Sequence, residues 1–133
     1  MTDKQTLVSY RMAQAEETLS DAEIMLKDNG SPRSVINRAY YSMFYAVLAL
    51  LLHSGINPRT SKHSGVLSMF DKEFVKTGRI DASFSKALHR LFDQRLKGDY
   101  KEMIEFTPVQ AQEGVAAARV FLAAIKAITA DGM

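Results

Sequence analysis

The feature that most constrains the fold is an apolar stretch in the second quarter of the chain. From Ala39 to Leu52 only Ser42 interrupts a run of aliphatic and aromatic side chains. This run is shorter than the roughly 20 residues that a membrane-spanning helix needs, so it predicts the core helix of a globular protein. A helix that is apolar on every face must be surrounded by protein. In a chain of 133 residues few other helices are available to cover it, so we expect a second copy of the chain to cover part of it, in a homodimer.

The composition favours one packed domain over residues 1–133. The apolar share is 47%, and the sequence contains no cysteine, which excludes disulfides, thiolate zinc sites, iron–sulfur clusters and a cysteine nucleophile. No repeat, domain linker or low-complexity segment is evident. The N-terminus lacks the pattern of a signal peptide. We therefore expect a cytoplasmic protein without a membrane segment.

Periodic apolar positions predict a long first helix. Its stripe follows alternating steps of four and three residues and consists of Val8, Met12, Ala15, Leu19, Ala22 and Leu26. Asn29 and Gly30 follow the stripe, and glycine tolerates the left-handed conformation in which many helices end. We expect the helix to stop at Gly30.

Capping residues delimit the second helix, which contains the apolar stretch. Ser31 can accept hydrogen bonds from free N–H groups, and Pro32 suits the first helical turn. His53 and Gly55 mark the predicted end.

The third helix is predicted from Thr60 or Ser61 and closes at Thr77 and Gly78. Its apolar face consists of Val66, Met69, Phe70 and Phe74. The spacing of these residues is helical.

Two more helices complete the prediction. Asp81 is a good N-cap for a fourth helix. We expect Gly98 to end this helix before a polar link. The apolar stripe of the helix contains Phe84, Leu88, Leu91 and Phe92. Thr107, Pro108 and Gln110 form a capping-box start for the fifth helix, which buries Val115, Ala118, Phe121, Leu122 and Ile125. No strand pattern is present. The predicted fold class is all-α, an antiparallel up-down bundle of about five helices.

The absence of four motifs argues against several kinds of enzyme. The sequence has no GxxxxGK, GxGxxG, HExxH or GxSxG motif, which argues against a P-loop hydrolase, a zincin and an α/β hydrolase. The histidines His53, His63 and His89 lack the i, i+3 or i+4 spacing of a helical metal site. We expect no metal and no cofactor.

Polar residues at the border of the apolar stretch form a first candidate binding site. Asn37 and Arg38 lie one turn before an aromatic band, Tyr40, Tyr41, Phe44 and Tyr45. Arg38 either anchors the helix by an ion pair, for example to Glu16 or Asp21, or binds an anion. The ion-paired anchor is the favoured alternative. The aromatic band is expected in a core or interface, with stacking on bases as the alternative.

The second candidate site lies at the end of the fourth predicted helix. Arg95 and Asp99 are four residues apart, so they can pair along a helix, and Tyr100 follows. Residues 59–101 carry 10 basic and 5 acidic side chains, a surplus that suits phosphate. The segment is either a helix cap ordered by Arg95 or a cleft in which Arg95 holds a phosphate that Asp99 and Tyr100 orient.

Three segments resemble the HEPN superfamily, small all-α domains found in prokaryotes and higher eukaryotes. They are NRAYYSMFYAVLALL at 37–51, TSKHSGVLSMFDKEFVKTG at 60–78 and RLKGDY at 95–100, and the resemblance covers nearly the whole chain. It implies a HEPN-like helical bundle that forms a homodimer with a cleft at the interface. It also implies an RNA or nucleotide ligand and a nucleotidyltransferase-fold protein as partner in a toxin–antitoxin-like pair. Many members are metal-independent ribonucleases that use an Arg followed after four to six residues by a His.

The sequence departs from that pattern, because Arg95 matches the Arg while Asp99 stands roughly where the His would come. Aspartate is ionised at neutral pH and repels phosphate. The first hypothesis is a nucleotide-, RNA- or protein-binding module with a cleft formed by Asn37, Arg38, Tyr41, Arg95, Asp99 and Tyr100. The second is an RNA endonuclease with Arg95 as phosphate ligand and a non-standard acid or base, the candidates being Asp99, Tyr100 and His63. The third is a purely structural interaction protein.

Overall fold

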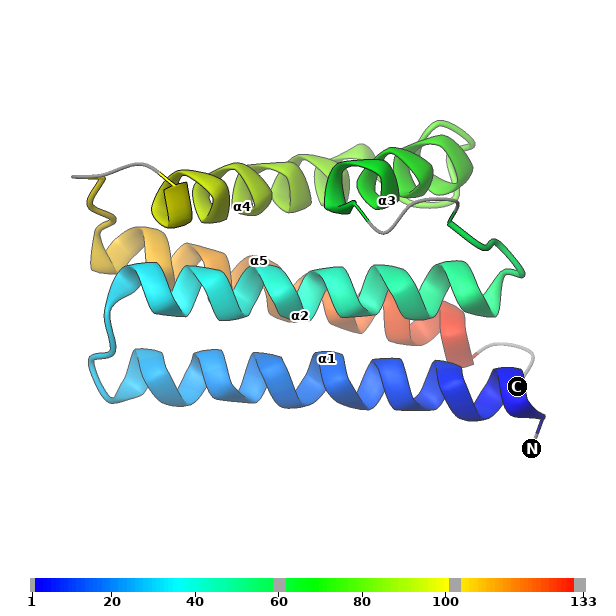
Figure 1. Cartoon of the computed structure of the whole chain (residues 1–133), viewed down its shortest axis with the longest axis horizontal. Helices are drawn as coiled ribbons and strands as arrows, with labels where there is room; N and C mark the ends of the chain where they lie inside the picture. The colour runs from blue at the N-terminus through cyan, green and yellow to red at the C-terminus, as the bar shows by residue number, and fades with distance from the viewer. Residues whose placement is uncertain (1, 59–61, 101–103, 131–133) are drawn as a thin grey trace.

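A computed structural model describes residues 2–58, 62–100 and 104–130 as an antiparallel bundle of five helices (Figure 1). The elements are α1 (Asp3–Lys27), α2 (Pro32–His53), α3 (His63–Phe70) with a π-helical turn η1 (Asp71–Val75), α4 (Ala82–Tyr100) and α5 (Pro108–Ala130). The described residues contain no strand. The predicted all-α class and helix number are confirmed.

Helix α2 is the centre of the bundle. It packs against α1, α5, α4 and α3, and Figure 1 shows α1 on one side of it, α4 on the other and α5 behind. Its buried residues are Val35, Ile36, Ala39, Tyr40, Ser42, Met43, Phe44, Ala46, Val47, Ala49, Leu50 and Leu51. Helix α2 is long and apolar enough to cross a membrane by length and composition, but 67% of its most apolar window is buried in the bundle. It is a core helix, as predicted.

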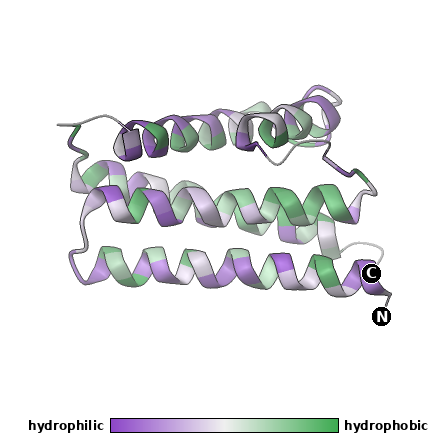
Figure 2. Ribbon diagram, viewed as in Figure 1, coloured by the Kyte–Doolittle hydropathy of each residue, from purple (hydrophilic) through white to green (hydrophobic). Residues whose placement is uncertain are grey.

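The apolar stretch of α2 therefore does not by itself require a homodimer. The helices of a single chain already cover most of α2, because α5 closes its rear face while α1 and α4 flank it. Within the apolar stretch from Ala39 to Leu52, the half-buried residues form one stripe at steps of four, three and four: Tyr41, Tyr45, Leu48 and Leu52. Figure 2 shows apolar residues concentrated in the C-terminal half of α2, where this stripe ends.

Most predicted helix starts are confirmed by their capping hydrogen bonds. The Ser31 hydroxyl accepts from the Ser34 N–H at 3.2 Å, and an Asp81 carboxylate oxygen accepts from the Ser83 N–H at 3.0 Å. Before α5, the Gln110 N–H donates to the Thr107 hydroxyl and the Thr107 N–H donates to the Gln110 side chain, at 3.1 and 2.8 Å. This reciprocal pair is the predicted capping box.

Helix α3 begins at His63; the predicted start at Thr60 or Ser61 lies outside the described residues. Val66, Phe70 and Phe74 are buried as expected, and Met69 is partly buried. The positive φ of 78° at Gly78 closes the segment.

The prediction that Gly98 breaks the fourth helix is wrong. Helix α4 continues through Gly98 to Tyr100, and Gly98 is buried. A Cβ atom there would lie 3.1 Å from Cε2 of Phe106 and 3.4 Å from Cγ of Arg33. Glycine is present because α4 packs closely against these two side chains. Asp99 and Tyr100, which the prediction places in the polar link, belong to α4, and residues 101–103 lie outside the described part.

The end of α1 also differs in detail from the prediction. Asn29, with φ of 59°, adopts the left-handed conformation, which asparagine tolerates better than most residues. Gly30 has another role: its N–H donates to the Met25 carbonyl at 2.6 Å. A Cβ atom on Gly30 would lie 2.9 Å from that carbonyl oxygen, so only glycine fits without a backbone shift.

We expect Gly30→Ala to lower the free energy of unfolding by about 1–3 kcal/mol, the usual range for added atoms that force the backbone to move. Urea unfolding followed by circular dichroism measures this. Gly114→Ala is the matched control, because its Cβ would meet only the flexible end of Leu91, at 3.1 Å, and alanine favours the helix. Equal losses in the two variants would contradict the role assigned to Gly30.

Candidate functional site

Arg95 is a nearly buried cation on the side of α4 that faces α2. Its side chain is 10% exposed, and Nη1 donates to the Tyr41 hydroxyl at 3.0 Å. The predicted pair with Asp99 is present at 3.6 Å, which is long for a charge-assisted hydrogen bond. The Arg95 Nε is buried and has no hydrogen-bond partner among the described residues. The guanidinium is thus only partly neutralised.

Three aromatic rings surround this guanidinium. Its central carbon lies 5.2 Å from the ring centre of Tyr40, 5.4 Å from that of Tyr41 and 5.7 Å from that of Phe92. Ring faces attract cations at such distances. They hold Arg95 in place but supply no full negative charge. A bound anion would therefore balance the remaining positive charge of the guanidinium.

Arg38 approaches the same Tyr41 ring. Its guanidinium carbon lies 5.2 Å from the ring centre, and the Asn37 side-chain oxygen accepts from Arg38 Nε and Nη2 at 3.1 and 2.8 Å. Tyr41 therefore has two guanidinium groups in contact with one ring.

The favoured prediction for Arg38, an ion-paired anchor to α1, is wrong. Glu16 pairs with Lys126 of α5 at 2.8 Å. No ion pair between Arg38 and Asp21 occurs in the described part of the chain, although both line one groove. The orientation of α1 directs Glu16 to α5 and leaves Arg38 with a neutral amide.

Two grooves adjoin at Arg38. The α1–α2 groove has a volume of about 340 Å³ and is lined by Tyr10, Gln14, Glu17, Asp21, Arg38 and Tyr45. The α2–α4 groove has a volume of about 280 Å³ and is lined by Met25, Arg33, Ser34, Asn37, Arg38 and Asp99. Volumes of this order suit small-molecule ligands.

His63, at the start of α3, lies beside the Arg95 cluster. Its ring stacks on Phe44 with centres 3.9 Å apart and planes 5° from parallel, and its Nδ1 lies 2.7 Å from the Tyr40 hydroxyl. Burial, and secondarily the charge of Arg95, lower the pKa of His63. Burial raises the pKa of Tyr40 well above its usual range. Tyr40 therefore donates and a neutral His63 accepts.

The structure brings together most of the residues singled out from the sequence. Asn37, Arg38, Tyr41, Arg95 and Asp99 form one connected cluster. Tyr100, the remaining candidate, is 78% exposed, and no described contact joins it to the cluster.

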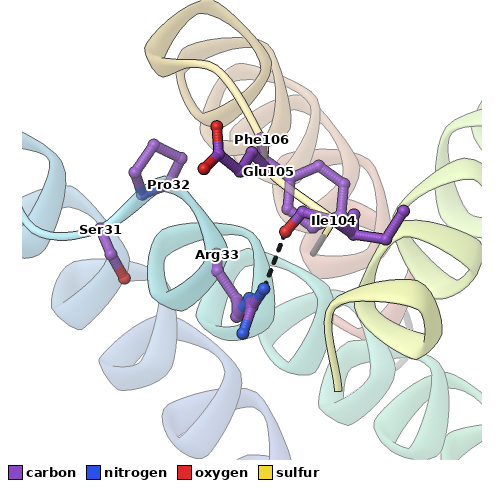
Figure 3. A pocket seen from close by; sticks show the side chains of 6 residues that line it. All are labelled: Ser31, Pro32, Arg33, Ile104, Glu105 and Phe106. Atoms are coloured by element: carbon purple, nitrogen blue, oxygen red, sulfur yellow. Dashed lines mark hydrogen bonds between the residues drawn. The ribbon is translucent and has the colours of Figure 1, made fainter. Parts of the chain in front are cut away.

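Arg33 was missed by the sequence analysis. Figure 3 shows it in a third pocket, of about 360 Å³, formed with Ser31, Pro32, Ile104, Glu105 and Phe106. Arg33 Nη2 donates to the Ile104 carbonyl at 2.8 Å. Cγ of Arg33 lies against Gly98, where a Cβ atom would be 3.4 Å away. We therefore assign Arg33 to packing around Gly98, although it also lines the α2–α4 groove. The signal for this contact in the sequence is Gly98, for which the local pattern predicts a helix end instead.

Comparison with known proteins agrees with this architecture. A family model described as the HEPN domain matches residues 8–128. A UPF0332 protein of Thermotoga maritima is 41% identical over 131 residues, which is 98% of this chain and 97% of that protein. A UPF0332 protein of Pyrococcus horikoshii is 54% identical over 82 residues, 61% of this chain and 56% of that protein.

A protein of Methanocaldococcus jannaschii named "Putative toxin" is 42% identical over 87 residues, 65% of this chain and 58% of that protein. The chain thus spans almost all of the Thermotoga protein and little more than half of the other two. With a family match over nearly its whole length and the expected helical bundle, the chain belongs to the HEPN domain family.

Proposed function

We propose that this HEPN domain is a binding module that holds a phosphate group of RNA or of a nucleotide at Arg95 and Arg38. The observation that carries the proposal is the state of Arg95. Its side chain is 10% exposed, its nearest carboxylate lies 3.6 Å away, and its Nε has no partner in the described chain. A buried cation with incomplete pairing is stabilised by a bound anion.

The surroundings of Arg95 favour phosphate among anions. Guanidinium groups bind phosphate oxygens through two parallel hydrogen bonds. Arg38 lies on the same Tyr41 ring and lines both grooves, whereas Arg95 lines neither, so Arg38 is the cation that a ligand in either groove would contact first. Tyr45 in the α1–α2 groove offers a ring on which a base can stack.

Binding is better supported than cleavage. A metal-independent ribonuclease needs a group that takes a proton from the 2′-hydroxyl. Nδ1 of His63, the acceptor nitrogen of the neutral ring, already accepts from Tyr40 at 2.7 Å. Its ring is stacked on Phe44. We therefore assign His63 to holding α3 on α2, and we place the endonuclease hypothesis second.

The biological setting follows from the family. Two relatives from Methanocaldococcus jannaschii are named putative toxins, which supports a role in a toxin–antitoxin-like pair. The resemblance to the HEPN superfamily adds a nucleotidyltransferase-fold protein as the expected partner and the cytoplasm as the expected location. In this setting the HEPN chain is the half that binds the nucleic acid or nucleotide. The purely structural hypothesis does not account for the partly neutralised charge of Arg95.

We expect Arg95→Gln and Arg38→Gln each to weaken binding of a short single-stranded RNA about tenfold or more, as the loss of a hydrogen bond to a charged group does. Fluorescence anisotropy measures the affinity, and each lost phosphate contact should also reduce its dependence on salt. Arg119→Gln is the matched control, because Arg119 lies on α5 and pairs with Glu23 at 2.8 Å. Circular dichroism checks that each variant is folded.

An equal loss of binding in Arg119→Gln would refute a defined phosphate site. RNA recovered from the wild-type protein should be intact on a gel. Cleavage that persists with chelator and disappears in Arg95→Gln would instead favour the endonuclease.

The role of His63 predicts a pH dependence of stability. Because its pKa in the folded protein lies below the ordinary 6.5, the unfolded chain binds a proton first as the pH falls. The contribution of His63 to the free energy of unfolding is full above about pH 6.5 and decreases below it. Urea unfolding of the wild type and of His63→Gln, near neutral pH and near pH 5, should therefore show a smaller difference at the lower pH. A difference that stays constant or grows would contradict a neutral, buried His63.

We propose a homodimer whose interface uses the C-terminal end of the half-buried stripe of α2, Leu48 and Leu52, so that Tyr45 remains in the lining of the α1–α2 groove. Light scattering at micromolar concentration is expected to give twice the 14.8 kDa mass of the chain. Leu48→Glu places a charge on the stripe and should yield the monomer. Val120→Glu is the control, since Val120 is an exposed apolar residue on α5. A monomeric mass for the wild type would refute the dimer.

A further inference from the structure

We infer that the α1–α2 groove is a nucleobase subsite that selects bases presenting N–H donors, guanine above all. The inference rests on the proposed function, because it takes the phosphate of the same ligand to lie at Arg38, where the two grooves adjoin. It adds a specificity that a phosphate site by itself does not have.

The charges of α1 are divided between two faces. Glu16 pairs with Lys126 and Glu23 pairs with Arg119, both through α5, at 2.8 Å. Glu17 and Asp21 instead line the α1–α2 groove and form none of the ion pairs found among the described residues. These two carboxylates are four residues apart, so they lie on one face of α1.

The groove places opposite charges along its length. Arg38 is the one cation among its lining residues, and Glu17 and Asp21 supply two negative charges. A ligand that fits both must carry an anionic group at one end and hydrogen-bond donors elsewhere. A nucleotide has this pattern, with its phosphate at Arg38 and the N–H groups of its base at the carboxylates.

The walls of the groove suit a flat aromatic ligand. Tyr10 and Tyr45 line it from α1 and α2. Tyr10 is 60% exposed, with the Arg11 guanidinium carbon 5.9 Å from the centre of its ring. Arg38 and Tyr45 are seven residues apart on α2, about 10 Å along the helix axis. That separation is comparable to the reach of a nucleotide from its phosphate to its base, and bases stack well on tyrosine rings.

Donor and acceptor chemistry decides which base fits. Ionised carboxylates only accept hydrogen bonds. The Watson–Crick edge of guanine presents two adjacent donors, N1–H and the 2-amino group, which match one carboxylate. Hypoxanthine lacks the amino group, and uracil presents a single N–H between two carbonyl oxygens that a carboxylate repels. The groove should therefore rank GMP above IMP and IMP above UMP.

The test is calorimetric titration of the full chain with GMP, IMP and UMP. We expect GMP to bind at least about fivefold more tightly than UMP, with IMP between them, as for a base read through a bidentate contact. Comparison of GMP with IMP isolates the amino group, because the two rings have equal area for stacking.

Two double variants show which carboxylates discriminate. Glu17→Gln with Asp21→Asn should bring the GMP to IMP ratio close to one without weakening UMP. Glu16→Gln with Glu23→Gln removes the same charge from the α5 side of α1 and should keep the wild-type ratio. Thermal melting confirms that both variants are folded.

The outcomes separate this inference from the proposed function. Equal affinity for the three nucleotides, lost in Arg38→Gln, would overturn the base subsite and leave the phosphate site standing. A preference for GMP over IMP that persists in the Glu17→Gln and Asp21→Asn variant would also overturn the base subsite, because the two carboxylates would then not be the groups that recognise the amino group. Absence of binding by all three nucleotides would overturn the base subsite, and the RNA titration of the wild type and Arg95→Gln would then decide the phosphate site by itself.

Discussion

The burial of α2 is the constraint on which the rest of the structure depends. An apolar helix without a polar face is stable only when other helices surround it, and α1, α4 and α5 do so here. This arrangement brings the aromatic band of α2 against α4. Tyr40 is fully buried, and its hydroxyl group is satisfied by His63 at 2.7 Å. Because a buried hydroxyl without a partner is costly, the start of α3 is positioned by the same packing.

Arg95 follows from this packing. Once α4 lies against α2, the guanidinium faces Tyr40, Tyr41 and Phe92 and has little access to water. Gly98 permits the approach, because a side chain there would press on Phe106 and Arg33. The core thus creates a cation whose charge is incompletely balanced by the chain itself. A phosphate bound at the proposed site would balance this charge. The adjoining α1–α2 groove contains Glu17 and Asp21, two carboxylates of α1 that form no ion pair with α5 among the described residues.

Local signals in the sequence were reliable wherever a single helix turn decides the outcome. The caps at Ser31, Asp81 and Thr107 involve residues two or three positions apart, and the pair of Arg95 with Asp99 lies within one turn. The same signals failed where distant segments meet. Gly98 was interpreted as a helix end because its close neighbour Phe106 belongs to another segment of the chain.

The amino-acid sequence by itself determined the helical class, the starts of α2, α4 and α5 and the membership of the HEPN family, because these depend on periodicity, capping and local motifs. The tertiary structure alone decided how the charges are used. Arg38 was expected to pair with α1, but the rotation of α1 about its axis directs Glu16 to Lys126 and leaves Arg38 beside Asn37. Ion pairs between helices depend on rotation and approach to within a few ångströms, and no spacing along one chain segment encodes these quantities. The tertiary structure also decided how much of α2 its own chain covers, because that depends on how α1, α4 and α5 pack around it.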